Sequence, residues 1–460
     1  MVYKELNLCF KCLFLADEKD FLLGHIVNKD KNYYELQKRL DKQVSGAPFS
    51  PILIDILSIL LKSEDAKIAC QIPTKFITVK KLSKRIGLSA EYLNERINVL
   101  ASSGFIVDLM HNEERYVSLT PIVVGFFEFT YMRTNSKLPT NKLVSLFEEY
   151  MHGDNIFYNS LFSGKTQLSR TYVREESISA DNYTEVLDWE KASHVIKTAS
   201  KIAVCLCACR HHKQHLGDGC DVPEEMCLSL NYAAESMIKT NLGKQITSDQ
   251  GFDILQEAKQ RGLVQTGDNV KRTPAYICNC CGCCCGMIAG MKNYNIPNTI
   301  VPSNWIVSIN EGLCKGCGEC EKLCPLNAIE IIKEYKNGKL KKKASANKDI
   351  CFGCGVCQTK CKFNAILMKP REKRIYTPES VFDRQVVMAI ERGKLSELLF
   401  EDLSAFSYKA FGRIFSIIEN TNVLKAMLAV KPLNSIFLNS LVKGAKISMG
   451  SISKKLDRKA

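Results

Sequence analysis

The residues of this sequence best suited to bind metal are its cysteines, which are most concentrated in the run ICNCCGCCCG at residues 277–286. The thiols of this run belong to Cys278, Cys280, Cys281, Cys283, Cys284 and Cys285. Cysteine can pack as a small hydrophobic residue, but neighbouring cysteines point in different directions on a helix or a strand. No single apolar face therefore accounts for the run, and the alternatives are disulfides and metal ligation.

The rest of the chain favours metal over disulfides. Its 460 residues include 22 cysteines, and its N-terminal segment has acidic residues soon after a short apolar run and no small-residue cleavage site. No apolar run is long enough to predict a membrane-spanning helix. We therefore expect a cytoplasmic protein, in which thiols stay reduced and dense cysteine indicates metal or redox chemistry.

A regular cysteine pattern occurs twice farther along the chain. It reads Cys314-x2-Cys317-x2-Cys320-x3-Cys324-Pro325 and recurs at Cys351, Cys354, Cys357 and Cys361, where Lys362 replaces the proline. In this spacing three cysteines surround one 4Fe-4S cluster and the fourth ligates the other cluster. One cluster is therefore assigned to Cys314, Cys317, Cys320 and Cys361. The other is assigned to Cys351, Cys354, Cys357 and Cys324.

The repeated pattern closely resembles the bacterial dicluster ferredoxin domain. A strand-like segment follows each motif, at residues 328–331 and 365–368, as a two-fold repeat requires. A structural zinc site needs only four cysteines and leaves the repeat unexplained. A hairpin with lysines separates the two motifs and turns at Asn337-Gly338. Its lysines either dock an acidic electron-transfer partner or, as we favour, simply solubilise an exposed turn.

Further cysteines precede the run at Cys205, Cys207, Cys209, Cys220 and Cys227. Period-two spacing predicts a strand over 201–210 that carries the first three on one face. Crowded thiolates repel one another unless a cation neutralises them, so we expect at least one further iron–sulfur cluster, or alternatively zinc, in residues 205–285. The most conventional ligand set is Cys207, Cys209, Cys220 and Cys227. A second or alternative set is Cys280, Cys281, Cys284 and Cys285.

Polar residues beside these thiols have two interpretations each. Arg210 either hydrogen-bonds a cluster sulfur or an anionic substrate, or it forms a surface salt bridge. Three histidines, His211, His212 and His215, are either metal ligands or, as we favour, exposed polar residues of a loop. The lone pair Cys9-x2-Cys12 is assigned no site, and Cys70 is expected to be buried packing.

The motifs together resemble a family of cysteine-rich iron–sulfur proteins of anaerobic bacteria and archaea over residues 33–392. The matching positions are Cys207, Cys209, Arg210, Cys220, Pro223, Cys227 and the run from Cys278 to Cys285, whereas Cys205 is extra. A winged-helix-like segment precedes them and the ferredoxin pattern follows them. The resemblance implies iron–sulfur binding and this architecture, and it specifies no reaction.

The fold class that we predict is multidomain α+β. Residues 1–72 are expected to be helical. Residues 73–135 are expected to form a winged-helix-like segment of two helices and a hairpin, and residues 136–198 are expected to form a linking α/β region. Residues 199–300 are expected to form the cysteine-rich metal region, which includes a helix capped by Thr247 and stopped by Gly262. Residues 305–372 are expected to form the ferredoxin region. Residues 373–460 return to a helical pattern.

These patterns predict an iron–sulfur protein of low-potential electron transfer, acting as a carrier or as a reductase component. No catalytic residue can be assigned, and no nucleotide or flavin motif is present in the sequence, so the redox partner is expected to be another protein. The alternative is a redox-responsive transcription regulator that reads DNA through the winged helix. Glu91 and Glu95 on its second helix disfavour DNA. Aromatic and basic residues over 406–446 fit either a core-packing helix pair, which we favour, or peripheral membrane contact.

Overall fold

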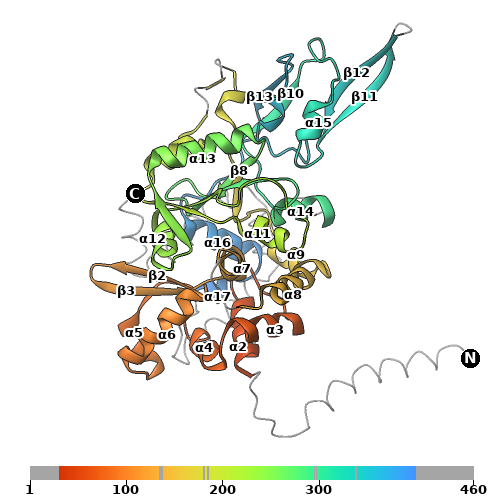
Figure 1. Cartoon of the computed structure of the whole chain (residues 1–460). Helices are drawn as coiled ribbons and strands as arrows, with labels where there is room; N and C mark the ends of the chain where they lie inside the picture. Colours follow the sequence, from red (N-terminus) through yellow and green to blue (C-terminus); the bar gives the residue numbers. More distant parts are fainter. Residues whose placement is uncertain are drawn as a thin grey trace, which may run out of the picture.

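A computed structural model of the protein describes residues 31–399, apart from 134–137, 180–181, 184–185, 295, 297 and 337–338. It combines helices and sheets, as predicted. In Figure 1 the N-terminal helices (red and orange) lie at the bottom and residues 305–370 (cyan to blue) project at the top right, with a six-stranded sheet and its helices between them. The pair Cys9 and Cys12 and the tail over 406–446 lie outside the described residues.

The first described helices build the lower part of the molecule. They are α2 (Lys31–Asp41), α3 (Pro51–Leu60) and α4 (Ser63–Ala69). Ser50 fixes the start of α3, because its hydroxyl accepts a hydrogen bond from the amide of Ile52 and Pro51 suits the first helical position.

A helix–turn–helix followed by a hairpin comes next, with the helices and strands expected from the sequence. Its elements are β1 (Ile77–Thr78), α5 (Val79–Ile86), α6 (Ala90–Ser102), β2 (Ile106–His111) and β3 (Glu114–Leu119), and its sheet order is β1-β3-β2. Thr78 and Ser89 cap the two helices with their hydroxyls. Gly87 ends α5 at a φ of 70°, a conformation that other residues adopt at a cost.

The chain then returns to the N-terminal core. The returning elements are η1 (Ile122–Phe126), α7 (Phe127–Tyr131), α8 (Thr140–His152) and α9 (Ile156–Leu161). Much later in the sequence, α16 (Val381–Glu391) and α17 (Leu395–Leu399) pack into the same core. Arg392 just after α16 donates to the carbonyls of Val44 and Ser163, so the described chain ends against its own beginning.

A six-stranded antiparallel sheet forms the middle of the molecule. Its strands are β4 (Ser169–Thr171), β5 (Ile202–Cys205), β6 (Cys227–Leu230), β7 (Gly243–Ile246), β8 (Val264–Asp268) and β9 (Tyr276–Cys280), in the order β4-β8-β9-β6-β5-β7. The helices of this region are η2 (Glu175–Ser177), η4 (Asp188–Glu190), α10 (Ala192–Thr198), α11 (Ala208–His215), α12 (Asn231–Lys239), α13 (Ser248–Gln260) and α14 (Gly286–Tyr294). The predicted capping box of Thr247 and the stop at Gly262 are confirmed for α13.

The two cysteine repeats lie in the projecting unit. It contains β10 (Trp305–Ile309), α15 (Glu319–Leu323), β11 (Ile329–Lys336), β12 (Lys339–Ala346), η5 (Val356–Gln358) and β13 (Ile366–Pro370). β10 pairs with β13 and β11 with β12, so a strand follows each motif as predicted. The hairpin's turn at 337–338 is outside the described residues.

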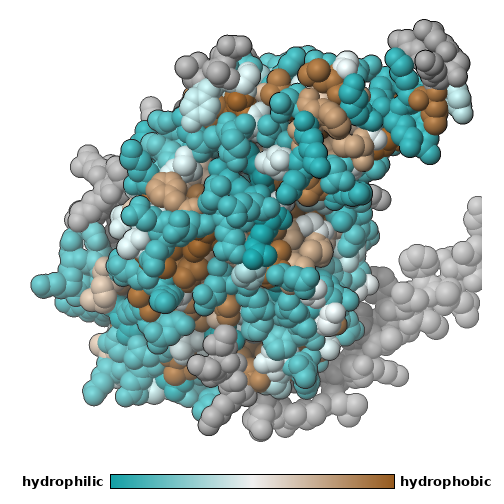
Figure 2. Space-filling view, turned by 45° about the horizontal axis from the view of Figure 1, so that its top comes forward, coloured by the Kyte–Doolittle hydropathy of each residue, from teal (hydrophilic) through white to brown (hydrophobic). Residues whose placement is uncertain are grey.

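In the described part of the chain, no helix has both the length and the apolar character needed to cross a membrane. The face drawn in Figure 2 is mostly hydrophilic, and its hydrophobic residues form small separate patches. That face offers no continuous apolar surface.

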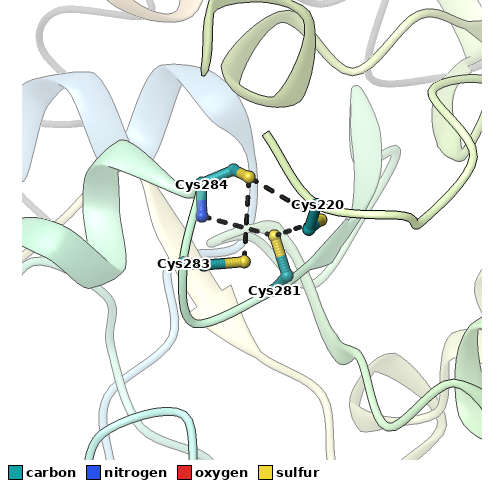
Figure 3. Close-up of side chains that lie close together, drawn as sticks. All are labelled: Cys220, Cys281, Cys283 and Cys284. Carbon is teal, nitrogen blue, oxygen red and sulfur yellow. Dashed lines mark hydrogen bonds between the residues drawn. The ribbon is translucent and has the colours of Figure 1, made fainter. Parts of the chain in front are cut away.

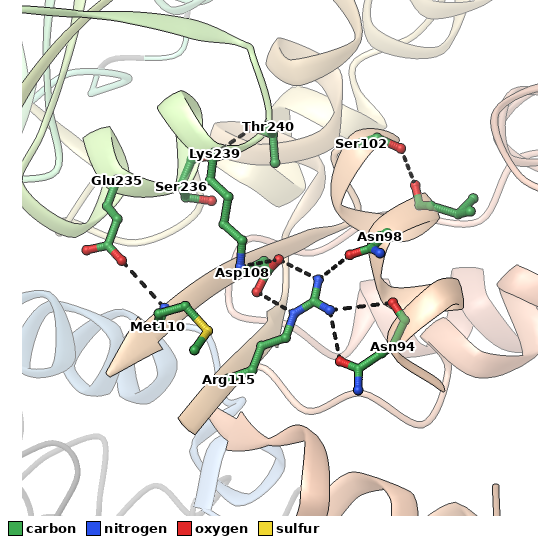
Figure 4. Close-up of polar contacts among 11 residues, drawn as sticks. Asn94, Asn98, Ser102, Asp108, Met110, Arg115, Glu235, Ser236, Lys239 and Thr240 are labelled. Carbon is green, nitrogen blue, oxygen red and sulfur yellow. Dashed lines mark hydrogen bonds and ion pairs between the residues drawn. The ribbon is translucent and has the colours of Figure 1, made fainter. Parts of the chain in front are cut away.

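The hairpin β2–β3 is fastened to the sheet region by a buried carboxylate (Figure 4). Asp108 on β2 receives two hydrogen bonds from Arg115 on β3, at 3.0 and 2.7 Å, and an ion pair from Lys239 on α12 at 2.8 Å. Arg115 also reaches Asn94 and Asn98 on α6. Burial acts to raise the pKa of Asp108, but the two cations outweigh it and lower the pKa.

We expect Asp108→Ala to lower the free energy of unfolding by about 1–3 kcal/mol, because charged hydrogen bonds across this junction are lost. The loss should stay constant between about pH 8 and pH 5, since Asp108 keeps its charge above its lowered pKa, and should shrink only below the ordinary value of 3.8. Thermal unfolding at several pH values measures it. Asp55→Ala, at an exposed position of α3, is the control and should change little.

Candidate metal centres

Four cysteines from the two repeats line one pocket of the projecting unit. They are Cys314, Cys317 and Cys320 from the first repeat and Cys361 from the second. The remaining wall is largely apolar and includes Ile331, Ala344, Phe363, Ala365 and Ile366. This placement supports the assignment of Cys361 to the first cluster, although it lies in the second motif.

The complementary set surrounds Cys324. Burial, followed by the charges of neighbouring thiols that include Cys351 and Cys324, raises the pKa of Cys354 to about 12. Burial and then the neighbouring thiols, with Cys324 among them, likewise raise the pKa of Cys357. Cys324 is therefore close to the first three cysteines of the second repeat, as the predicted exchange of fourth ligands requires.

The backbone around these thiols suits anionic sulfur. The amides of Ala344, Ala365 and Ala328 donate to the sulfurs of Cys314, Cys361 and Cys324 at 3.4, 3.3 and 3.2 Å. Positive φ angles let the loops turn tightly at Gly316, Gly318, Gly353 and Gly355. Thiols in two sets of four, with amide donors aimed at sulfur, fit two 4Fe-4S clusters.

Arg174, which the sequence analysis did not single out, places a buried positive charge beside the second set. Its amide donates to the carbonyl of Cys354 at 3.1 Å, and Nη2 donates to the carbonyl of Leu263 at 2.9 Å. Its Nε and Nη1 have no partner among the described residues. Burial lowers the pKa of Arg174, whereas the charges of Cys354, Glu176 and Cys357 act to raise it. No local spacing signals a residue so far from its partners in sequence.

The other cysteines gather at one edge of the six-stranded sheet. Because its strands are antiparallel, the end of β5 at Cys205, the start of β6 at Cys227 and the end of β9 at Cys280 meet there. The predicted strand over 201–210 was wrong beyond Cys205: Cys207 directly precedes α11, and Cys209 lies inside that helix. The period-two pattern is therefore broken where a helix begins, and the three thiols do not share a strand face.

Six of these thiols form a continuous series, here called the buried thiol row. Hydrogen bonding links successive members in the order Cys207, Cys227, Cys278, Cys280, Cys285 and Cys209. Donation from Cys207 and then Cys278 lowers the pKa of Cys227, and donation from Cys278 and then Cys285 lowers the pKa of Cys280 to about 6. The row is thus arranged to hold negative charge at two of its positions.

Four other thiols form a compact group, here called the four-thiol group (Figure 3). Its members are Cys220, Cys281, Cys283 and Cys284, and their sulfurs all lie within 4.8 Å of one another. The amide of Cys284 donates to the sulfur of Cys281 at 3.4 Å. Hydrogen bonding from the Cys284 thiol, followed by that amide, outweighs burial and lowers the pKa of Cys281 to about 4.

The structure therefore divides the ten predicted ligands differently from the sequence. Cys220 leaves its predicted set and joins the four-thiol group, whereas Cys280 and Cys285 leave theirs and join the row. The run ICNCCGCCCG contributes three thiols to each. The grouping depends on tertiary contacts, because thiols of the run meet thiols that lie far upstream in the sequence. Metal ligation by these ten residues stays a prediction.

Of the polar neighbours, Arg210 is the one that faces sulfur. It is fully buried and donates to the carbonyls of Pro223 and Asn279 and to the sulfur of Cys281 at 3.9 Å, so the surface salt bridge is excluded. The histidines lie on helix α11 and not on a loop. His211 contacts the carbonyl of Tyr131, and His212 is buried against α7 and α8. None belongs to the four-thiol group.

The sequence analysis also missed Glu128 on α7. Its carboxylate accepts a hydrogen bond from the amide of Gly125 at 2.8 Å. Burial, which outweighs that bond, raises the pKa of Glu128 to about 7, and the charge of Cys227 adds to the increase. An acidic side chain therefore approaches the buried thiol row.

Comparison with protein families bears directly on the projecting unit. The model of the 4Fe-4S dicluster domain matches residues 313–365, a stretch that contains both cysteine repeats. The chain contains a ferredoxin-type dicluster domain. The match implies 4Fe-4S clusters, and with the cysteine-rich sheet edge it indicates an iron–sulfur protein of electron transfer. No curated protein and no solved structure matches the chain.

The dicluster domain is packed tightly onto the thiol-rich sheet edge. One hydrophobic cluster includes Cys280 and Cys285 of the row, and Cys324 and Cys354 of the dicluster domain pack against it. A Cβ atom on Gly282 would lie 3.0 Å from both Cα and O of Pro325. Only glycine fits this contact without displacing the proline that follows Cys324.

We expect Gly282→Ala to weaken this junction, because overpacking of a tight contact typically costs about 1–3 kcal/mol. The apparent melting temperature of the anaerobically purified protein and the iron retained after desalting should both fall. Gly286→Ala, at the first residue of α14, is the matched control, since its Cβ would meet only the hydroxyl of Tyr158, at 3.6 Å. If both substitutions lowered the melting temperature and the retained iron equally, the close contact between Gly282 and Pro325 would be contradicted.

Proposed function

We propose that this protein is a low-potential electron-transfer protein, a carrier or a reductase component, in which the dicluster domain exchanges electrons with metal held by the buried thiol row. The observation that carries the proposal is the shared hydrophobic cluster, which joins thiols of the row to thiols of the second cluster site. The motif resemblance to iron–sulfur proteins of anaerobes supports the iron–sulfur binding on which this function rests.

The bound clusters would supply reversible one-electron transfer. Cys314, Cys317, Cys320 and Cys361 hold the first cluster in this proposal, and Cys351, Cys354, Cys357 and Cys324 hold the second. The two cluster sites differ in how far their cysteines are exposed to solvent, and we assign them different roles on that ground. Cys317 is exposed, so the first site faces a protein partner in solution, whereas Phe352 and Val356 bury the second site toward the sheet.

The buried thiol row is the site that we propose for the further iron–sulfur cluster. Its members are linked pairwise, yet among the described residues no three of them have sulfurs within 4.8 Å of one another. Such spacing favours an assembly of several metal and sulfide atoms over a single ion. Arg210 and Glu128 flank it with one positive and one titratable group.

The sequence-based division into domains at 72, 135, 198, 300 and 372 is retained as part of the proposal, with the helix–turn–helix and hairpin interpreted as a winged helix. That segment serves here as a packing module. Three polar side chains of α6 are already used within the chain: Arg96 pairs with Asp65, and Asn94 and Asn98 bind Arg115. These contacts do not favour the alternative of a DNA-reading regulator, so we do not adopt it.

Metal content and spin coupling test the proposal together. Two 4Fe-4S clusters account for about eight irons per chain, and a cluster in the row should raise this to about twelve or more. Cys278→Ser, which breaks the row, should remove the additional iron and leave the dicluster iron. Cys205→Ala is the control, because Cys205 contacts Ser229 and belongs to neither thiol set.

In the fully reduced protein, electron paramagnetic resonance should show magnetic coupling between the dicluster signals and a further paramagnet, and Cys278→Ser should abolish it. Iron that stays at about eight, with identical spectra for the wild type and Cys278→Ser, would end the proposal.

Arg174 should set the potential of the second cluster. We expect Arg174→Met to shift the reduction potential of one dicluster signal to more negative values, because a nearby buried cation stabilises the added electron. Arg174→Lys keeps the charge and should shift it much less. A redox titration followed by electron paramagnetic resonance measures both, and an unchanged potential in Arg174→Met would place the guanidinium outside the cluster's influence.

A further inference from the structure

The sulfur spacing of the four-thiol group carries information about how many metal atoms it can hold. The sulfur of Cys220 lies 3.8 Å from that of Cys281 and 3.7 Å from that of Cys284, which lies 3.7 Å from that of Cys283. A single ion bound to four sulfurs at about 2.3 Å in a tetrahedron has sulfur–sulfur edges of about 3.8 Å. The group therefore has the dimensions of a one-ion site.

The dicluster cysteines provide an internal comparison. An iron–sulfur cube separates its ligands by the width of the cube, so cysteine sulfurs around it must lie farther apart than around one ion. Among the described residues, only the four-thiol group brings three or more potential ligand atoms within 4.8 Å of one another. The same structure thus spaces the dicluster thiols widely and these four thiols closely.

The surroundings complete a closed site. Cys281 and Cys284 are buried in a small cluster with Met226, Ala258 and Leu263, while Cys283 is exposed at its outer side. The amide of Cys284 and the guanidinium of Arg210 both donate to the sulfur of Cys281, which offsets part of the charge of four thiolates. Four cysteine ligands leave no open coordination position, as in structural zinc sites.

We infer that Cys220, Cys281, Cys283 and Cys284 bind one zinc ion, separate from the iron–sulfur clusters. Cys220 comes from the loop between α11 and β6, and the other three come from the loop between β9 and α14. The ion ties these loops together next to Gly282, which contacts the dicluster domain at Pro325. It therefore fixes the loop that connects Cys280, at the end of β9, to Cys285, and both of these cysteines belong to the buried thiol row.

Metal analysis of the full-length, anaerobically purified protein tests this inference. The wild type and Cys205→Ala should each contain one zinc per chain, whereas Cys283→Ser and Cys220→Ser should lose it and keep their iron. Their apparent melting temperatures should fall by several degrees. Since Cys283 is exposed, Cys283→Ser separates loss of the ion from general misfolding.

X-ray absorption at the zinc edge of the wild type provides a measurement that requires no variant. Four sulfur neighbours at about 2.3 Å are expected. Nitrogen or oxygen neighbours would overturn the assignment, and so would unchanged zinc in both cysteine variants. Loss of one iron instead of zinc would overturn the choice of metal, and loss of about four irons would show a cube at this site. An iron count of about eight with zinc intact would defeat the proposed row cluster and leave this inference standing.

Discussion

Thiolates crowded into a protein interior repel one another, and the middle of this structure is organised around that repulsion. Cations and hydrogen-bond donors are required wherever sulfurs meet. Backbone amides donate hydrogen bonds to the sulfurs of Cys314, Cys324 and Cys361. Two buried arginines supply positive charge beside other cysteines. Arg174 stands beside the second dicluster site, and Arg210 reaches the sulfur of Cys281. In our proposal metal supplies the remaining neutralisation, and the fold and its cofactors then depend on each other.

The antiparallel sheet explains how distant cysteines reach one place. Reversal of the chain between β5, β6 and β9 returns Cys205, Cys227 and Cys280 to the same edge. The run from Cys278 to Cys285 divides between two neighbouring groups, with Cys278, Cys280 and Cys285 in the buried thiol row and the other three thiols in the four-thiol group. This is possible because consecutive residues of an extended segment and a turn point in different directions. Packing of Gly282 on Pro325 then sets the dicluster domain against this edge. A relay between metal centres needs such a fixed separation.

What the sequence could predict was local. The spacing of the two repeats, the cap at Thr247, and the hairpin around residues 112–113 all depend on residues a few positions apart. The grouping of the upstream thiols could not be derived from the sequence because it depends on tertiary contacts: Cys220 meets Cys281, and Cys209 meets Cys285. Arg174 was missed for the same reason. The helix that contains Cys209 was missed because alternating cysteines imitate a strand up to the position where α11 begins.

Exposure among the described cysteines is uneven, and this sets an order of oxidative damage. Only Cys283 and Cys317 are exposed, one at the four-thiol group and one at the first dicluster site. Oxidants that arrive from solvent meet these sulfurs first, whereas no cysteine of the buried thiol row is exposed. With metal bound as we propose, brief contact with air would therefore strip metal first from the two sites with an exposed thiol, and a partly oxidised sample would keep its innermost metal.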